Sequence, residues 1–170
     1  MRSLRVVVAD DHNLTLSGVS DSLVAHGIEV VGRGGTAGEA VALVAKHSPD
    51  ALITDHDFGP GPTGLDIASS LREKHPALGI VLLSAFGDPR LHSESLVSAP
   101  AGVVYLIKQR VESTDQLAEA IHTAIKKAKN SERGVIPAVN LTASQIAVLR
   151  LVVKGLSNKA IALELAVSEE

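Results

Sequence analysis

Polar side chains that can do chemistry directly follow four short apolar runs of this chain. They comprise three carboxylates, one hydroxyl and one amine, and in chain order they are Asp10, Asp11, Asp55, Ser84 and Lys108. Short continuous apolar runs are typical of strands buried on both faces, as in a parallel sheet. Parallel sheets place function at the carboxyl ends of their strands, so these side chains are expected along one edge. The set predicts a site for a cation and a phosphoryl group.

Three carboxylates at one edge predict a magnesium site. Each ionised carboxylate disfavours the charge on the next, so the group needs a cation. Hard oxygen ligands suit Mg²⁺, which keeps several waters and takes one or two carboxylates. One carboxylate can then attack phosphorus and form an aspartyl phosphate. Lys108 can spread the charge of the transferring group, and Ser84 can donate a hydrogen bond to a phosphoryl oxygen.

Taken singly, each of these residues also has a plainer interpretation. An Asp-Asp pair after a strand is often a turn or a helix cap, and Asn13 can cap the next helix by itself. The segment 55–57 can be an ordinary polar loop, and a serine or lysine after a strand is unremarkable. The functional interpretation is favoured because four strands carry the whole set in the right order.

The elements that must position these residues alternate between strands and helices. Apolar runs predict strands over 6–9, 28–31, 51–54, 79–83 and 103–107. Helical spacing of apolar residues predicts helices between them, the last ending near Lys129, and a further, less regular helix is expected over 88–100. This alternation indicates an α/β unit with right-handed crossovers. In the strand order 2-1-3-4-5, strands 1 and 3 are neighbours, so the three carboxylates converge.

The chain changes character after residue 129. Residues 130–140 break the periodicity and are interpreted as a linker, and residues 141–170 as a small all-α unit. Thr142 and Gln145 form a capping box for one helix, and Gly155 ends that helix. A second helix is expected from Ser157, and a further cap at Ser168. We therefore expect three parts, 1–129, 130–140 and 141–170.

Composition narrows the class of protein. Only 2% of residues are aromatic, so the core must be built from Val, Leu, Ile and Ala. The absence of cysteine excludes disulfides and thiolate chemistry and suits a cytoplasmic protein. No stretch approaches the roughly 18 apolar residues of a membrane span, and no signal peptide is visible. We expect no membrane association.

The charge distribution gives no polyanion-binding surface. Residues 1–125 hold nine Lys/Arg against fifteen Asp/Glu, and residues 137–170 hold three of each. The basic run from Lys126 to Lys129 is interpreted as a helix end, where positive charge suits the dipole. The seven histidines show no i,i+4 pair, so a zinc site is not expected. His12 and His56 are assigned to packing or solvent contact.

Residues 1–128 resemble the receiver domain of bacterial two-component response regulators, a flavodoxin-like fold. The matching segments are Val6-Val-Val-Ala-Asp-Asp-His12, Leu52-Ile-Thr-Asp55, Val81-Leu-Leu-Ser-Ala85 and Tyr105-Leu-Ile-Lys108. The resemblance implies that a sensor histidine kinase phosphorylates Asp55. It also implies a magnesium ion held by Asp10, Asp11, Asp55 and the backbone carbonyl of Asp57. Ser84 and Tyr105 match the switch pair that responds to phosphate.

Two departures from the receiver pattern concern the loop after the acceptor and the residue after Lys108. The segment 58–64, Phe-Gly-Pro-Gly-Pro-Thr-Gly, is one residue longer than the family's usual turn. Counting back from Gly61 nominates Asp57 as the acceptor, whereas Asp55 ends the apolar strand directly. We favour Asp55. Gln109 stands where a proline or an acidic residue is more usual.

The tail resembles the LuxR-type helix-turn-helix, which places the chain in the NarL/FixJ class of transcription regulators. The similarity rests on Leu141-Thr-Ala-Ser-Gln145 and Gly155-Leu-Ser-Asn-Lys-Ala-Ile-Ala162. It implies DNA contacts from Ser157, Asn158 and Lys159 on the scaffold helix. In the family the recognition helix begins just after the position of Ser168, so we expect a truncated helix-turn-helix. The chain as given is therefore not expected to bind DNA specifically, although the complete protein is.

The combined interpretation is a phosphorylation-controlled transcription regulator that forms a homodimer when phosphorylated. No enzymatic activity is expected beyond self-catalysed phosphoryl transfer and autodephosphorylation. Three alternatives remain open: a phosphorylation-dependent protein-interaction module without DNA binding, a Mg²⁺-dependent phosphatase, and a degenerate receiver that never takes phosphate. The complete set of carboxylates, serine and lysine disfavours the last of these.

Overall fold

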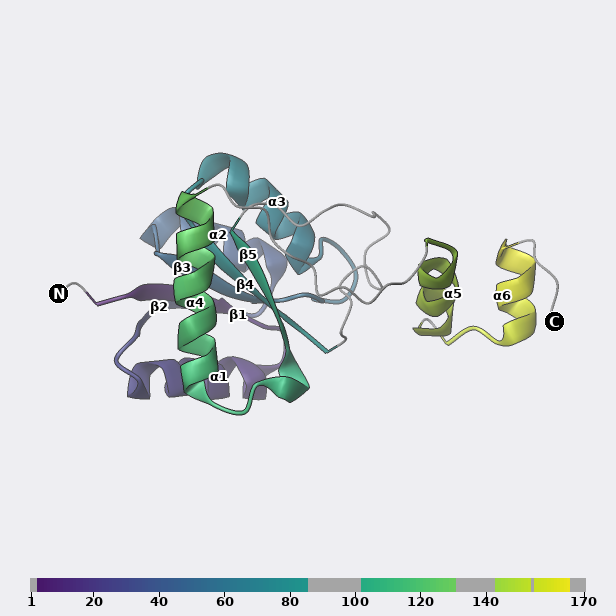
Figure 1. The fold of residues 1–170 in the computed structure, drawn as a ribbon, viewed down its shortest axis with the longest axis horizontal. Helices are drawn as coiled ribbons and strands as arrows, with labels where there is room; N and C mark the ends of the chain where they lie inside the picture. Colours follow the sequence, from purple (N-terminus) through teal and green to yellow (C-terminus); the bar gives the residue numbers. More distant parts are fainter. Residues whose placement is uncertain (1–2, 86–101, 131–142, 154, 166–170) are drawn as a thin grey trace.

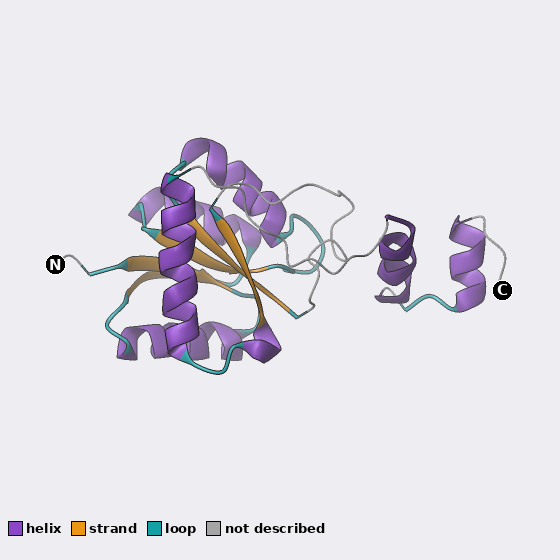
Figure 2. Ribbon diagram, viewed as in Figure 1, coloured by secondary structure: helices purple, strands orange, loops and turns teal. Residues whose placement is uncertain are grey.

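A computed structural model describes residues 3–85, 102–130, 143–153 and 155–165 (Figure 1). Strands and helices alternate through the first two ranges, as Figure 2 shows. The strands are β1 Arg5–Ala9, β2 Glu29–Gly34, β3 Ala51–Asp55, β4 Gly79–Ser84 and β5 Val103–Ile107. The helices are α1 Asn13–Ala25, α2 Ala37–His47, α3 Gly64–Lys74, the 3₁₀ turn η2 Lys108–Arg110 and α4 Thr114–Lys129. Two further helices, α5 Ala143–Val153 and α6 Asn158–Leu165, belong to the tail.

The five strands form one parallel sheet in the order β2-β1-β3-β4-β5, which confirms the predicted α/β class and strand order. Val8 of β1 pairs with Ile53 of β3, so the two strands end at the same level. The residues that follow them therefore meet at the carboxyl edge, as expected for neighbouring parallel strands.

Helices cover both faces of the sheet, and each face has its own apolar core. One core joins β1 residues Val7 and Ala9 to buried side chains of α2 and α3. The other joins Val6 and Val8 to buried side chains of α1 and α4. Successive residues of β1 serve opposite cores because side chains alternate along a strand. β3 and β4 are buried along their whole length, which explains their continuous apolar sequence.

β2 differs from its predicted range of 28–31. It begins at Glu29 and continues to Gly34, past two glycines that normally indicate a turn. A Cβ atom at Gly32 would lie 3.0 Å from Cδ2 of Leu43 in α2. Gly32 and Gly34 therefore let α2 pack closely on the sheet, and the strand continues through Gly32 to end at Gly34.

The helix ends follow local capping chemistry. The Thr36 and Ser113 side chains accept backbone N–H groups at the starts of α2 and α4, and Thr63 forms a reciprocal capping box with Asp66 at α3. At α1 the N-cap position belongs to His12, so the alternative that Asn13 caps this helix is wrong. α4 ends at Lys129, as predicted.

In the tail, the end of α5 and the start of α6 agree with the sequence prediction. Gly155 has a φ of 78°, and its N–H donates to the carbonyl of Val152 over 2.9 Å just after α5. The Ser157 hydroxyl accepts the N–H of Ala160 over 3.3 Å and so caps α6. The expected helix over 88–100, the Thr142 capping box and the Ser168 cap lie outside the described residues. Within the described ranges, no helix has the length and apolar character needed to cross a membrane.

Candidate functional site

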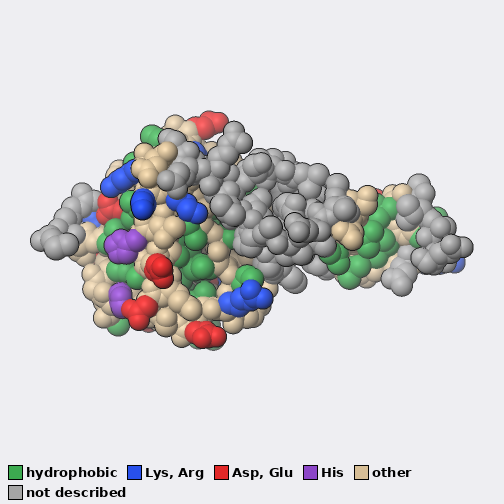
Figure 3. Space-filling view, in the orientation of Figure 1, with side chains coloured by type: hydrophobic (Ala, Val, Ile, Leu, Met, Phe, Trp, Pro, Cys, Tyr) green, Lys and Arg blue, Asp and Glu red, His purple; other side chains and the backbone are tan. Residues whose placement is uncertain are grey.

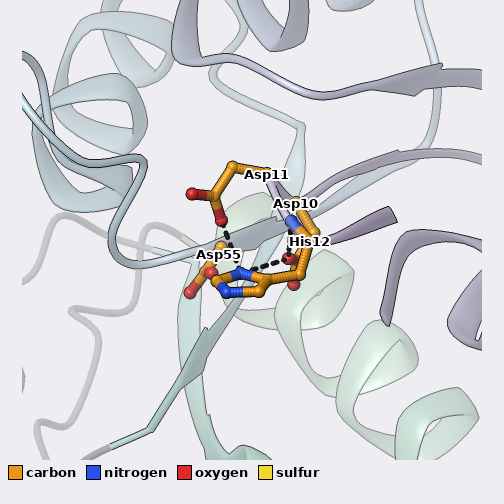
Figure 4. Close-up of side chains that lie close together, drawn as sticks. All are labelled: Asp10, Asp11, His12 and Asp55. Carbon is orange, nitrogen blue, oxygen red and sulfur yellow. Dashed lines mark hydrogen bonds and ion pairs between the residues drawn. The ribbon is translucent and has the colours of Figure 1, made fainter. Parts of the chain in front are cut away.

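The site lies at the carboxyl edge of the sheet, where β1 and β3 end side by side. Asp55 is the last residue of β3 and Asp10 directly follows β1, and their exposed fractions are only 5% and 1%. Asp11, the next residue, is exposed. Figure 4 shows these three carboxylates close together, with the ring of His12 among them. The predicted convergence of the three aspartates is therefore present in the fold.

Lys108 connects the two buried carboxylates. It is the first residue of η2, directly after β5, and its Nζ donates to Oδ2 of Asp10 over 2.8 Å and to Oδ2 of Asp55 over 2.7 Å. Its own side chain is 23% exposed. Two short charge-assisted hydrogen bonds from one ammonium hold the ends of β1, β3 and β5 together.

The pKa values of Asp55 and Lys108 are shifted by burial and by the hydrogen bonds and charges that these residues share with Asp10. Burial raises the pKa of Asp55, and the attraction of Lys108 only partly opposes that effect while Asp10 adds to it. Burial alone would lower the pKa of Lys108, but its hydrogen bonds to Asp10 and Asp55 outweigh burial and raise the pKa. Lys108 is thus well compensated in its charged form, whereas Asp55 is not. The site is deficient in positive charge.

The loop after β3 distinguishes Asp55 from Asp57. The Asp57 carboxylate faces its own loop, where Oδ1 accepts the N–H of Gly59 over 2.9 Å. The N–H of Asp57 in turn donates to Oδ1 of Asp55 over 3.3 Å. The one-residue extension is accommodated by positive φ angles at Gly59 and Gly61. Asp57 is therefore a turn-forming residue, while Asp55 points to Lys108.

Gly64, at the start of α3, sits directly under the site. A Cβ atom there would overlap the carbonyl oxygen of Asp55 and lie 2.5 Å from Cδ2 of Leu82. Its N–H donates to the carbonyl of His56 over 2.8 Å. The close approach of α3 to the end of β3 thus requires glycine.

Ser84 and Tyr105 occupy different environments. Ser84 ends β4, is 3% exposed, and lines a cleft of about 250 Å³ together with Asp11, Asp55 and Lys108. Tyr105 lies in β5 opposite Leu82, packs against the core on the α2 and α3 side, and has a buried hydroxyl oxygen. The cleft therefore receives Ser84 directly, whereas Tyr105 is one strand away.

Sequence reasoning missed the position of His12. Its side chain is 73% exposed, in agreement with the expected solvent contact, but its Nδ1 also lies 2.8 Å from Oδ1 of Asp11 and 3.6 Å from Oδ1 of Asp10. Its N–H also donates to Oδ1 of Asp10 over 2.9 Å. The only available signal was its place directly after the Asp-Asp pair. His56, in contrast, is 1% exposed and buried, in agreement with a packing role.

The donor set fits a divalent cation. Asp10, Asp11, His12 and Asp55 each offer one ligand atom, and these atoms all lie within 4.8 Å of one another. Three of the four are carboxylate oxygens, which are the preferred ligands of hard cations such as Mg²⁺. The deficit of positive charge around Asp55 favours a cation in the same place.

The predicted DNA-contacting residues surround the start of α6. Ser157 is the N-cap, Asn158 is the first helical residue and Lys159 is exposed. On the face seen in Figure 3, charged side chains of both signs are scattered among the described residues.

Comparisons with known proteins match both parts of the chain. The family model of the response regulator receiver domain matches residues 6–122. The model described as bacterial regulatory proteins of the luxR family matches residues 139–170. The first match alone covers more than half of the chain, so it identifies the family and the fold.

Curated relatives and solved structures agree with these models. The transcriptional regulatory protein DesR of Bacillus subtilis is 30% identical, over 96% of this chain and 82% of DesR. The oxygen regulatory protein NreC of Staphylococcus haemolyticus is 29% identical, over 97% of this chain and 84% of NreC. The signal receiver domain of a response regulator NarL from Mycobacterium tuberculosis is 27% identical with a TM-score of 0.57, over 76% of this chain and 98% of that domain. A DNA-bound structure of RcsB dimers is 24% identical with a TM-score of 0.60, over 99% of this chain and 85% of that one.

Proposed function

Because this chain belongs to the two-component response regulators that control transcription, with a receiver domain and a LuxR-type helix-turn-helix, we propose that Asp55 is its phosphoacceptor. A sensor histidine kinase is the donor. The Asp55 carboxylate attacks the phosphorus of a phosphohistidine, so an O–P bond forms as the P–N bond breaks. The observation that carries this proposal is the pair of hydrogen bonds from Lys108 to buried Asp55 and Asp10.

The other residues of the cleft have distinct roles in this proposal. Lys108 exchanges its hydrogen bond with Asp55 for one with a phosphoryl oxygen. Its positive charge then lies beside the group being transferred and stabilises the negative charge of the phosphoryl oxygens. The Ser84 hydroxyl turns and donates a hydrogen bond to another phosphoryl oxygen. The change in Ser84 is followed by a change in Tyr105 on the adjacent strand. Such a local change biases a two-state element, here the surface around β4, β5 and α4.

Mg²⁺ is the proposed cofactor. Asp11, Asp10 and Asp55, with the backbone carbonyl of Asp57, are the proposed protein ligands, and the carboxylate cluster supports this assignment. When bound, the ion offsets the negative charge that accumulates on the phosphoryl oxygens. Asp10 and Asp11 keep the acidic edge in place, and Lys108 fixes the orientation of Asp55.

The output of the proposed mechanism is transcriptional control by a phosphorylation-dependent homodimer. The proposed units are the receiver at 1–129, the linker at 130–140 and the helix-turn-helix from 141. The similarity to RcsB, a protein whose solved structure contains dimers bound to DNA, supports the general arrangement. Ser157, Asn158 and Lys159 are proposed DNA-facing residues of the scaffold helix, in a protein that acts in the cytoplasm and is not otherwise an enzyme.

The test is phosphorylation by a small donor. Wild type, Asp55→Asn and Asp57→Asn are incubated with Mg²⁺ and acetyl phosphate, and their intact masses are recorded. The wild type and Asp57→Asn should each gain one labile phosphoryl group, which EDTA prevents, and Asp55→Asn should gain none. Retained labelling of Asp55→Asn together with loss in Asp57→Asn would reassign the acceptor. No labelling of the wild type would identify a degenerate receiver.

A further inference from the structure

The ring of His12 lies at the solvent-facing side of the acidic site, close enough for a ring nitrogen to contact an ion bound there. Its side chain is 73% exposed, so the ring borders both solvent and the carboxylates. Its backbone N–H is tied to Asp10, and the ring nitrogen Nδ1 lies against Asp11. Figure 4 shows the imidazole among the three carboxylates. His12 makes no side-chain cap for α1, so its ring has no evident part in holding the helix.

The separations around this nitrogen are near those of ligands that share one ion. In an octahedron with bonds of about 2.1 Å, adjacent donors lie about 3.0 Å apart and opposite donors about 4.2 Å apart. Nδ1 of His12 lies 2.8 Å from Asp11 Oδ1 and 3.6 Å from Asp10 Oδ1. The widest separation in the four-residue set is within 4.8 Å, which small rotations of the exposed Asp11 and His12 side chains can close.

We infer that His12 is a nitrogen ligand when a first-row transition ion such as Mn²⁺, Co²⁺ or Ni²⁺ occupies this site, and that its ring raises the affinity for such ions relative to Mg²⁺. The inference rests on the proposed metal site of the previous section and adds a ligand to it. Carboxylate oxygens suit Mg²⁺, whereas imidazole suits transition ions, so adding a nitrogen changes the relative affinities. In the arrangement described, Nδ1 faces Asp11; ligation through that nitrogen leaves the ring proton on Nε2.

A preference for transition ions is not by itself diagnostic. Sites made of oxygen alone also bind Ni²⁺ more tightly than Mg²⁺, because affinity for divalent ions follows a general order. What His12 predicts is a change in the ratio of the two affinities when the ring is removed. A residue that only orients Asp11 through a hydrogen bond would alter the affinity for both ions in the same proportion.

The experiment measures the affinities of wild type and His12→Ala for Mg²⁺ and Ni²⁺ by isothermal titration calorimetry. His122→Ala, which removes an exposed histidine of α4, is the matched control for nickel bound elsewhere on the surface. His12→Ala should lower the Ni²⁺ affinity by about tenfold or more and leave the Mg²⁺ affinity nearly unchanged. His122→Ala should change neither affinity at the first site.

Pulsed electron paramagnetic resonance of bound Mn²⁺ provides a direct readout. The wild type and His122→Ala should show modulation from a coordinated imidazole nitrogen, and His12→Ala should not. Equal losses of Mg²⁺ and Ni²⁺ affinity, or nitrogen modulation that persists in His12→Ala or is absent from the wild type, would overturn the inference. Labelling of Asp55 by acetyl phosphate with Mg²⁺ is measured in the same samples, so failure of the proposed function is seen separately from failure of the nitrogen ligand.

Discussion

Replacing Lys108 by Met tests the electrostatic account of the site. Met keeps most of the volume of the lysine stem but removes the ammonium that donates to Asp10 and Asp55 over 2.8 and 2.7 Å. Those two carboxylates are 2% and 7% exposed in their side chains, so water cannot replace the lost hydrogen bonds fully. The variant therefore contains two neighbouring buried carboxylates without a cation between them.

The expected loss of stability follows from that geometry. Removing one partner of a buried ion pair costs about 3–5 kcal/mol, because the other charge remains buried. Lys108 is 23% exposed and the carboxylates can take up a proton, so the lower end applies. We expect about 3 kcal/mol at neutral pH without metal, which lowers Tm by about 10 °C for a domain of this size.

The pH dependence separates charge from packing. Without Lys108 the folded-state pKa of Asp55 rises further above its unfolded value, so the folded variant binds more protons than the unfolded chain. Its deficit relative to the wild type should therefore be largest near pH 8 and shrink toward pH 5. Urea unfolding at both pH values measures this, with Lys126→Met, an exposed lysine of α4, as the control within about 0.5 kcal/mol of the wild type. A deficit of equal size at both pH values would refute the electrostatic reasoning and assign the loss to packing of the stem.

Three further predictions concern the supports of the site. Asp55→Asn should be more stable than the wild type at pH 7 without metal. Burial raises the pKa of Asp55 in the folded state, so ionisation of Asp55 lowers the stability of the wild type as the pH rises above the pKa of an unfolded aspartate. Urea unfolding should therefore show that the stability gained by the variant shrinks toward pH 4. Gly64→Ala should cost about 1–3 kcal/mol and slow acetyl phosphate labelling, because its Cβ overlaps the Asp55 carbonyl, whereas Gly18→Ala, with open space at its Cβ, should cost nothing in thermal denaturation. Arg72→Met should cost about 2–3 kcal/mol in urea unfolding, because its guanidinium donates to the carbonyls of His75, Pro76 and Leu78 at the end of α3; a loss below 0.5 kcal/mol would show that water replaces these bonds.

The sheet was predictable because its signal is local and repeated. Apolar runs such as 51–54 and 79–83 are continuous because β3 and β4 are buried on both faces, and their alternation with helices predicts a parallel sheet. The alternation does not fix the strand order, which was assumed to be one of the two common doubly wound arrangements. β2 was predicted too short because Gly32 and Gly34 resemble turn residues in sequence. Glycine is needed at these two positions because Leu43 of α2 packs against them, and the local sequence pattern does not show such a contact.

The sequence was sufficient to predict which residues come together at the site, but not the hydrogen bonds that orient each side chain. Asp10, Asp55 and Lys108 follow strands whose ends coincide, so their convergence follows from topology. The placement of His12 depends on how the chain turns from β1 into α1, a turn in which the Asp10 carboxylate accepts the His12 N–H. The exposure of His12 was expected from the sequence, but its contact with Asp11 depends on that turn, which the pattern of apolar residues does not describe.

The excess of negative charge at the site explains both why the metal-free domain loses stability there and why the site binds a cation. Among the described residues, Lys108 is the cation bonded to the two buried carboxylates, and Asp11 adds a third carboxylate beside them. Folding must therefore bury Asp55 in an environment that raises its pKa, at a cost in stability. A bound cation offsets this loss of stability, because it reduces the repulsion among the carboxylates and binds only the folded protein. Substitutions that neutralise the cluster should accordingly stabilise the resting domain and weaken metal binding together.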